Sequence, residues 1–271
     1  MILRASFTRP LLWLSSLATA CGSSGADAPH GSGGGPVPPG GGFVSRSVKD
    51  TSGLSIPIQV FIPGNYDRSR RWPVIVALAG QGERGNDGLK QTNVGMGLVV
   101  RAEQASFPAV VVFPQVPADE AGRQAFDRVI IQAISGVVRD YNGDPDRVYL
   151  TGLSFGATEG FVLAYANPTT FAAYATIAPG IPAIVVTGDR STPNSTVLSI
   201  AADRLRSLPL WVFQGENDPN VPVAYVRSLV AAFRAVDPTV QYTEYAGAGH
   251  NVWDAAYATP ALYTWLFAQH R

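Results

Sequence analysis

The stretch that decides the fold is V-Y-L-T-G-L-S-F-G at residues 148–156. Residues 147–150 are rich in β-branched and aromatic side chains and predict a strand. Residues 152–156 match the pattern G-x-S-x-G, and residues 157–166 predict a helix that ends before Asn167-Pro168. This pattern forms a nucleophile elbow when a strand precedes it, its glycines flank a sharp turn, and a helix follows it.

The elbow predicts a specific local geometry. A tight turn strains the backbone at Ser154 and exposes its hydroxyl at the carboxyl end of the strand. Gly152 and Gly156 allow strand and helix to approach closely. The amide of Phe155, at the helix N-terminus, is predicted to face an oxyanion formed there. The chain has 28 glycines, so an ordinary glycine-rich turn is the alternative until the rest of the chain is considered.

Composition limits the classes of function. The 271 residues are enough for one large α/β domain or two small ones. The 20 basic residues balance 20 acidic ones without a basic patch, which argues against a nucleic-acid partner. No stretch approaches the roughly 18 apolar residues that a membrane-spanning helix needs.

The N-terminus has the order of a secretory signal. Arg4 and Arg9 precede the apolar residues 11–14, and small residues lead to Cys21, the single cysteine. With this cysteine at the cleavage point, the segment resembles a bacterial lipoprotein signal, although Ala18 stands where Leu is commonest. We expect removal of residues 1–20, lipidation of Cys21, and export to the periplasm or cell surface as a membrane-anchored lipoprotein. The alternative is a plain signal peptide and a secreted protein.

The rest of the chain predicts a tether followed by one domain. Residues 21–42 are rich in Gly, Pro and Ser and have no apolar face, so we expect a flexible tether. Residues 43–271 begin with an antiparallel strand pair and then alternate strands with helices, which predicts a single doubly wound, mostly parallel α/β domain. The later strands are predicted at residues 74–78, 109–113, 147–150, 172–177, 210–213 and 240–245, with a strand-like stretch at 184–187. The helices are predicted at residues 94–104, 126–141, 157–166, 197–205, 223–236 and 260–269.

A serine nucleophile needs a base within hydrogen-bonding reach. The chain has three histidines. His30 lies in the tether and His270 is next to the C-terminus, whereas His250 lies in a Gly-rich loop after the last predicted strand. His250 is therefore the one good candidate for the base.

The loop after the L-W-V-F strand offers the orienting acid. It contains Glu216 and Asp218, and we prefer Asp218 because it precedes Pro219 and lies deeper in the loop. Asp189 and Asp237 are weaker candidates, the first in a region that is hard to interpret and the second at a helix end.

The order Ser154, Asp218, His250 is the one expected for an α/β-hydrolase. The second oxyanion donor should come from the loop after the strand at 74–78, where the amide of Gln81 is our choice. A plain Gly-rich turn is the alternative for that loop.

These residues resemble the α/β-hydrolase superfamily. Within it, the chain is similar to the esterase group that includes feruloyl and acetylxylan esterases, polyhydroxybutyrate-depolymerase-like enzymes and predicted peptidases. The similarity covers residues 43–271, and the motifs that carry it lie at residues 80–85, 152–156, 210–222 and 249–257. Two departures are Ala79, where His is common, and Ala157, where Gly is frequent. Neither removes a backbone donor, but Ala79 removes a side chain able to buttress the oxyanion loop.

The resemblance implies acyl transfer through an acyl-enzyme, without metal or cofactor. It implies short-chain or aromatic esters, small or linked to polysaccharide, as substrates. Gln115, Trp253 and Glu83 are expected to line the pocket, although Trp253 is equally compatible with the core and Glu83 with an ion pair to Arg84. A serine peptidase or a polyester or lipid hydrolase is the alternative, and no large lid is evident. A non-catalytic surface-binding lipoprotein on this scaffold is the alternative of another class.

Overall fold

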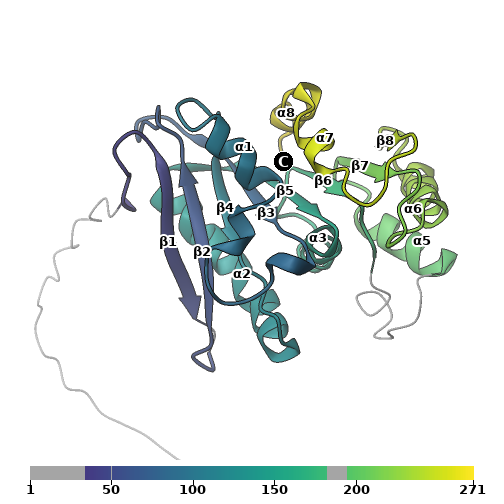
Figure 1. Cartoon of the computed structure of the whole chain (residues 1–271), viewed down its shortest axis with the longest axis horizontal. Coiled ribbons are helices and arrows are strands. Elements are labelled where there is room, and N and C mark those ends of the chain that lie inside the picture. The colour runs from purple at the N-terminus through teal and green to yellow at the C-terminus, as the bar shows by residue number, and fades with distance from the viewer. Residues whose placement is uncertain (1–33, 50, 182–193) are drawn as a thin grey trace, which may run out of the picture. The chain divides into compact units, whose positions relative to one another are not determined.

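The carboxyl ends of parallel strands create the edge on which the predicted site depends. The structure is a computed structural model that describes residues 34–49, 51–181 and 194–271. The described residues form an eight-stranded sheet in the order β1-β2-β4-β3-β5-β6-β7-β8 (Figure 1). The strands are β1 Gly42–Lys49, β2 Ser55–Ile62, β3 Trp72–Leu78, β4 Val110–Pro114, β5 Gly143–Leu153, β6 Ala173–Ile177, β7 Leu210–Gly215 and β8 Gln241–Tyr245.

The sheet is mostly parallel, as the alternation of elements predicts. β2 pairs antiparallel with β1 and β4, and all pairs from β4 to β8 are parallel. This strand order, together with the alternation of strands and helices along the chain, confirms the predicted α/β-hydrolase fold class. Ser154 follows β5, Asp218 follows β7 and His250 follows β8. All three therefore lie at the same edge of the sheet, where ligands bind in open α/β folds.

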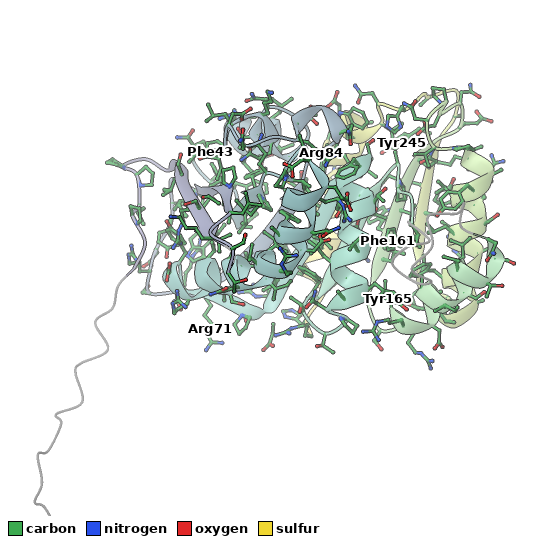
Figure 2. The ribbon with its side chains drawn as sticks, turned by 90° about the horizontal axis from the view of Figure 1, so that it is seen from below. Phe43, Arg71, Arg84, Phe161, Tyr165 and Tyr245 are labelled. Atoms are coloured by element: carbon green, nitrogen blue, oxygen red, sulfur yellow. The ribbon has the colours of Figure 1, made fainter. Side chains whose placement is uncertain are left out.

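Helices cover both faces of the sheet. The described helices are α1 Met96–Ala102, α2 Glu120–Asp140, α3 Phe155–Ala166, α5 Ser195–Arg204, α6 Val223–Val236, α7 Trp253–Tyr257 and α8 Pro260–Phe267, with 3₁₀ turns η1 Gln81–Glu83 and η2 Lys90–Thr92. Helices α2, α3, α5 and α6 bury their apolar side chains against one face, and α1, α7 and α8 against the other. Strand β3 serves both layers, since Val74 and Val76 face the first and Ile75 the second. Phe161 of α3, labelled in Figure 2, belongs to the first layer. Its ring is edge-on to that of Tyr174, with centroids 5.1 Å apart.

Helix α2 and strand β5 begin well before their predicted starts. Helix α2 starts at Glu120, six residues before its apolar periodicity, because the side chain of Asp119 caps it by accepting from the Gly122 amide at 2.7 Å. Strand β5 starts at Gly143. Helix α7 was not predicted, because five residues are too few for a helical repeat. The predicted strand at 184–187 and Asp189 lie outside the described residues.

The structure differs from the predicted tether at residues 34–41. The Gly35 amide donates to the Asp140 carbonyl at 3.1 Å, and the Tyr141 hydroxyl donates to the Pro36 carbonyl at 3.1 Å. Composition predicts flexibility for this segment, but its backbone groups find partners at the end of α2. Cys21, His30 and the rest of residues 1–33 lie outside the described residues. In the described part of the chain, no helix is long and apolar enough to span a bilayer.

Candidate active site

Ser154 occupies a sharp turn between β5 and α3. Its backbone has φ 51° and ψ −118°, a region that non-glycine residues rarely adopt. Its amide donates to the Ile177 carbonyl at 2.8 Å, and its carbonyl accepts from the Thr158 amide at 3.1 Å. Such a conformation costs on the order of 1–3 kcal/mol and persists only where the surroundings impose it. The sharp, strained strand-to-helix turn predicted at Ser154 is therefore present.

The two glycines of the elbow are required by close backbone contacts. A Cβ on Gly152 would lie 2.5 Å from the Gly156 carbonyl oxygen, and a Cβ on Gly156 would lie 2.3 Å from the Ala79 carbonyl oxygen. The second contact places the loop after β3 directly against the first turn of α3.

His250 connects the serine to a carboxylate. Its Nε2 lies 2.8 Å from Ser154 Oγ, and its Nδ1 lies 2.7 Å from Asp218 Oδ2. Both distances are those of hydrogen bonds. The side chain of Asp218 is fully buried, whereas that of His250 retains 17% exposure. The structure thus brings together the three residues that the sequence predicts as nucleophile, base and acid.

Asp218 is held by four hydrogen bonds. Oδ1 accepts from the amides of Asn220 at 2.8 Å and Val221 at 2.9 Å, and Oδ2 accepts from Gln214 Nε2 at 3.0 Å as well as from His250. Burial raises the pKa of Asp218, but the hydrogen bonds from His250, Val221 and Asn220 outweigh it and hold the pKa below its ordinary value. Asp218 is therefore an anion that orients the imidazole.

The weaker acid candidates have other partners. Glu216 Oε2 accepts from the Gly247 amide at 2.7 Å and braces the loop before His250. Asp237 Oδ1 accepts from the amide and hydroxyl of Thr239 at the end of α6. These contacts favour Asp218 over both.

Phe155 and Gln81, the predicted oxyanion donors, lie on two segments that pack together. Phe155 is the first residue of α3, where backbone N–H groups lack acceptors within the helix. Gln81 opens η1 in the loop that packs on the elbow through Ala79. The side-chain oxygen of Gln81 accepts from Arg84 Nη1 at 3.3 Å. Within the described residues, no group of three His, Cys, Asp or Glu side chains is placed to bind a metal ion.

Gln115, predicted to line the pocket, has its side chain inside the fold. Gln115 is fully buried, and its Oε1 accepts from the Gly88 amide at 2.7 Å. Its Nε2 donates to the Glu83 carbonyl at 3.0 Å and to Asp87 Oδ1 at 3.2 Å. The Gln115 amide is used to hold residues 83–88, so it is not available to a ligand.

Trp253 lies beside the predicted base. It begins α7, is half-buried, and its ring stands edge-on to the His250 imidazole with centroids 5.4 Å apart. Its contact with substrate stays a prediction.

Arg84 donates to the carbonyl of Pro117 at 3.0 and 2.6 Å and lies over the ring of Phe155. Glu83 contributes its carbonyl to Gln115.

Sequence reasoning missed Gln214 and Arg84. Gln214 is a fully buried amide in the apolar strand L-W-V-F-Q-G. A polar side chain in such a strand is the signal that would have marked it, because a buried amide needs partners.

Comparisons with known proteins agree with this geometry. Residues 50–256 match the family named Esterase and described as "Putative esterase". No curated protein matches the chain. A thermostable esterase of known structure is 30% identical with a TM-score of 0.70, and the match covers 84% of this chain and 63% of that one. The chain thus spans less than two thirds of that esterase.

Two more distant structures share the fold alone. A ferulic acid esterase from Anaeromyces mucronatus, in complex with ferulic acid, is 17% identical with a TM-score of 0.61, over 84% of this chain and 90% of that one. Dipeptidyl peptidase 4 from Porphyromonas gingivalis is 17% identical with a TM-score of 0.62, over 84% of this chain and 36% of that one. The family match covers most of the chain, and on this ground the chain belongs to the Esterase family.

Proposed function

We propose that the protein is a serine carboxylic-ester hydrolase that acts through an acyl-enzyme. The observation that carries the proposal is the unbroken hydrogen-bonded path from Ser154 Oγ through His250 to Asp218. This path supplies a nucleophile, a base and an anion to stabilise the protonated base.

The mechanism follows from the geometry. Ser154 Oγ attacks the ester carbonyl while His250 Nε2 takes its proton, and Asp218 stabilises the resulting imidazolium. The carbonyl oxygen becomes an oxyanion that accepts from the amides of Phe155 and Gln81. His250 then gives the proton to the departing alcohol. Water then gives a proton to His250 Nε2 as it attacks the acyl carbonyl, and His250 returns that proton to Ser154 Oγ as the acid departs.

We propose short-chain or aromatic acyl groups as substrates. The ring of Trp253 beside His250 offers a flat apolar surface close to the reacting atoms. A structural neighbour of this chain is a ferulic acid esterase, which makes hydroxycinnamate esters a suitable first aromatic probe.

The test compares residues 22–271 with the Ser154→Ala variant on p-nitrophenyl acetate, methyl ferulate, a long-chain p-nitrophenyl ester and a dipeptidyl p-nitroanilide. We expect the first two to be hydrolysed by the wild type alone. Equal turnover by the Ser154→Ala variant would contradict the proposal. Cleavage of the anilide without cleavage of any ester would favour a peptidase.

We also propose that the protein is exported and anchored through lipidated Cys21. The basic, apolar and small-residue order before Cys21 supports this. Expression with radiolabelled palmitate should label the wild type and leave a Cys21→Ala variant unlabelled. Labelling of both would count against the site.

A further inference from the structure

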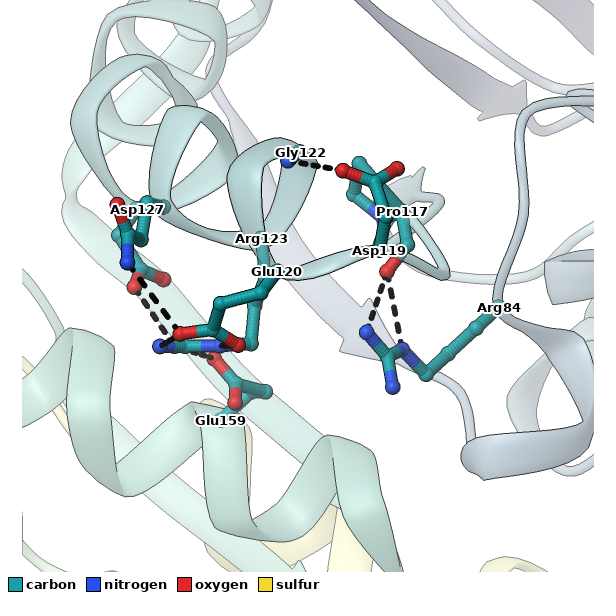
Figure 3. A network of polar contacts seen from close by, with 9 residues as sticks. Arg84, Pro117, Asp119, Glu120, Gly122, Arg123, Asp127 and Glu159 are labelled. Atoms are coloured by element: carbon teal, nitrogen blue, oxygen red, sulfur yellow. Dashed lines mark hydrogen bonds and ion pairs between the residues drawn. The ribbon is translucent and has the colours of Figure 1, made fainter.

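Arg84 joins the two segments that carry the proposed oxyanion donors. Its Nε and Nη2 donate to the Pro117 carbonyl at 3.0 and 2.6 Å, and its Nη1 donates to Gln81 Oε1 at 3.3 Å. The guanidinium carbon lies 4.5 Å from the centroid of the Phe155 ring. Figure 3 shows the guanidinium fork on Pro117, which belongs to the connection between β4 and α2.

The shape of the guanidinium explains how one side chain makes these contacts together. Two of its nitrogens on a single carbonyl fix the plane of the group. With the plane fixed, one face lies over Phe155 and the remaining nitrogen reaches Gln81. Arg84 thereby ties the loop after β3 and the first residue of α3 to the connection between β4 and α2.

The backbone hydrogen bonds inside η1 are long, so its position depends on contacts from outside the turn, with Gln115 and Val116 as well as through Arg84. In η1, the Glu83 amide lies 3.3 Å from the Gly80 carbonyl and the Arg84 amide 3.5 Å from the Gln81 carbonyl. Bonds of this length are at the weak end of the range. The side chain of Gln81 is exposed, and Ala79 has no polar group with which to buttress the loop. Oxyanion donors work only when they are fixed before the charge develops.

We propose that Arg84 is a positioning residue that holds the amides of Gln81 and Phe155 toward the oxyanion. This inference rests on the proposed esterase function. It assigns to Arg84 an effect on the tetrahedral transition state and little effect on binding of the planar ester.

The experiment compares Arg84→Met and Arg84→Lys with wild type in the full chain. Loss of one oxyanion donor lowers kcat about 10²–10³-fold, and a displaced donor should lose part of that, so we expect kcat to fall about 10–100-fold. KM should change less than about threefold. The affinity for an aryl boronic acid, which forms a tetrahedral adduct on Ser154, should fall in parallel with kcat. Arg84→Lys should recover little, because an ammonium cannot form the fork.

Arg70→Met is the matched control. Arg70 also lies over an aromatic ring, with its guanidinium carbon 3.7 Å from the centroid of Trp72 at the amino end of β3. We expect this variant to keep wild-type kcat and boronic acid affinity. If the Arg84 variants fail to fold, Gln81→Ala removes only the side-chain link and keeps the backbone amide, and it should lower kcat with KM unchanged.

The outcomes separate the two proposals. An inactive wild type would overturn both the esterase function and the role of Arg84. An active wild type whose folded Arg84 variants keep kcat and boronic acid affinity would overturn the positioning role alone. A rise in KM with kcat unchanged would also overturn it, because it would place Arg84 in ground-state binding.

Discussion

Gln214 Nε2 donates to the same oxygen of Asp218 that accepts His250 Nδ1, at distances of 3.0 and 2.7 Å. The same nitrogen donates to the Val221 carbonyl at 2.8 Å. Gln214 is fully buried at the end of β7. A single amide therefore ties the loop that carries the acid to a strand in the core.

Replacing Gln214 should reduce catalysis beyond its effect on stability. Gln214→Leu leaves the Val221 carbonyl with one partner fewer and frees Asp218 to turn away from His250. A hydrogen bond to a charged group contributes about 1.5–3 kcal/mol, and we expect kcat to fall about tenfold or more. Kinetics and thermal melts of Gln59→Leu supply the control, because Gln59 is a buried amide in β2 that bonds Gly88. Equal kcat losses in both variants at equal stability would contradict the prediction.

Ser154→Gly should stabilise the protein while abolishing its activity. Glycine adopts φ 51° without the penalty of a Cβ, so we expect a gain of about 1 kcal/mol, or about 2–4 °C in Tm for a domain of this size. Ser154→Ala keeps the Cβ and the strain, and so it is the control. Differential scanning calorimetry checks the result, and equal Tm values for the two variants would show that the turn holds no releasable strain.

The fold and the three central residues were predictable for two reasons. Some of the sequence patterns that mark them are local, and few residues of the required type compete for the remaining roles. The G-x-S-x-G stretch sets its own strand, turn and helix, and the described chain confirms them. Only three histidines compete for the base, and Asp218 is preferred as the acid because it precedes Pro219 and lies deeper in its loop. These inferences needed no knowledge of long-range contacts.

The rest depended on partners that are distant in sequence. Gln115 does follow β4 at the carboxyl edge, as predicted, but its direction is decided by residues 83–88, about 30 positions earlier. The Gly- and Pro-rich residues 34–41 have no pattern of their own, and their contacts come from Asp140 and Tyr141. The hydrogen-bond partners of these residues are set by the tertiary structure, and composition does not predict them.

The buried hydrogen bonds of Gln115 lead to a prediction about the loop that they hold. Gln115→Leu removes the bonds to Gly88, Glu83 and Asp87, so residues 83–88 should loosen. We expect faster amide hydrogen exchange in this loop and a lower Tm, since a buried backbone group without a partner costs about 1–3 kcal/mol. Exchange measured by mass spectrometry checks this, with Gln214→Leu as the comparison, because the Gln214 side chain bonds residues 215, 218 and 221 and not this loop. A large increase in KM with unchanged exchange would instead restore Gln115 as a substrate contact.

An acidic cluster on α2 and α3, in which Glu159 is buried, predicts how stability depends on pH. Arg123 pairs with Glu120 at 2.8 Å, Asp127 at 3.0 Å and Glu159 at 3.6 Å, so three carboxylates share one guanidinium (Figure 3). Burial and then the charge of Asp127 raise the pKa of Glu159 to about 7, against the charges of Arg123 and Arg84. Burial, above all, raises the pKa of Asp127 to about 6, with Glu120 adding to it and Arg123 and Arg128 opposing it.

These raised pKa values mean that the folded protein holds protons that the unfolded chain has already released. Stability therefore falls as pH rises, from the ordinary carboxyl pKa values near 4 up to about 7. We expect a lower free energy of unfolding at pH 8 than at pH 5.5, and Glu159→Gln should flatten this slope. Urea unfolding of both proteins at both pH values measures it. Asp87→Asn is the control: the pKa of Asp87 is lowered to about 2, chiefly by the amides of Lys90 and Leu89, so its contribution is constant across this window. A Glu159→Gln variant with the wild-type slope would show that Glu159 is ionised at both pH values.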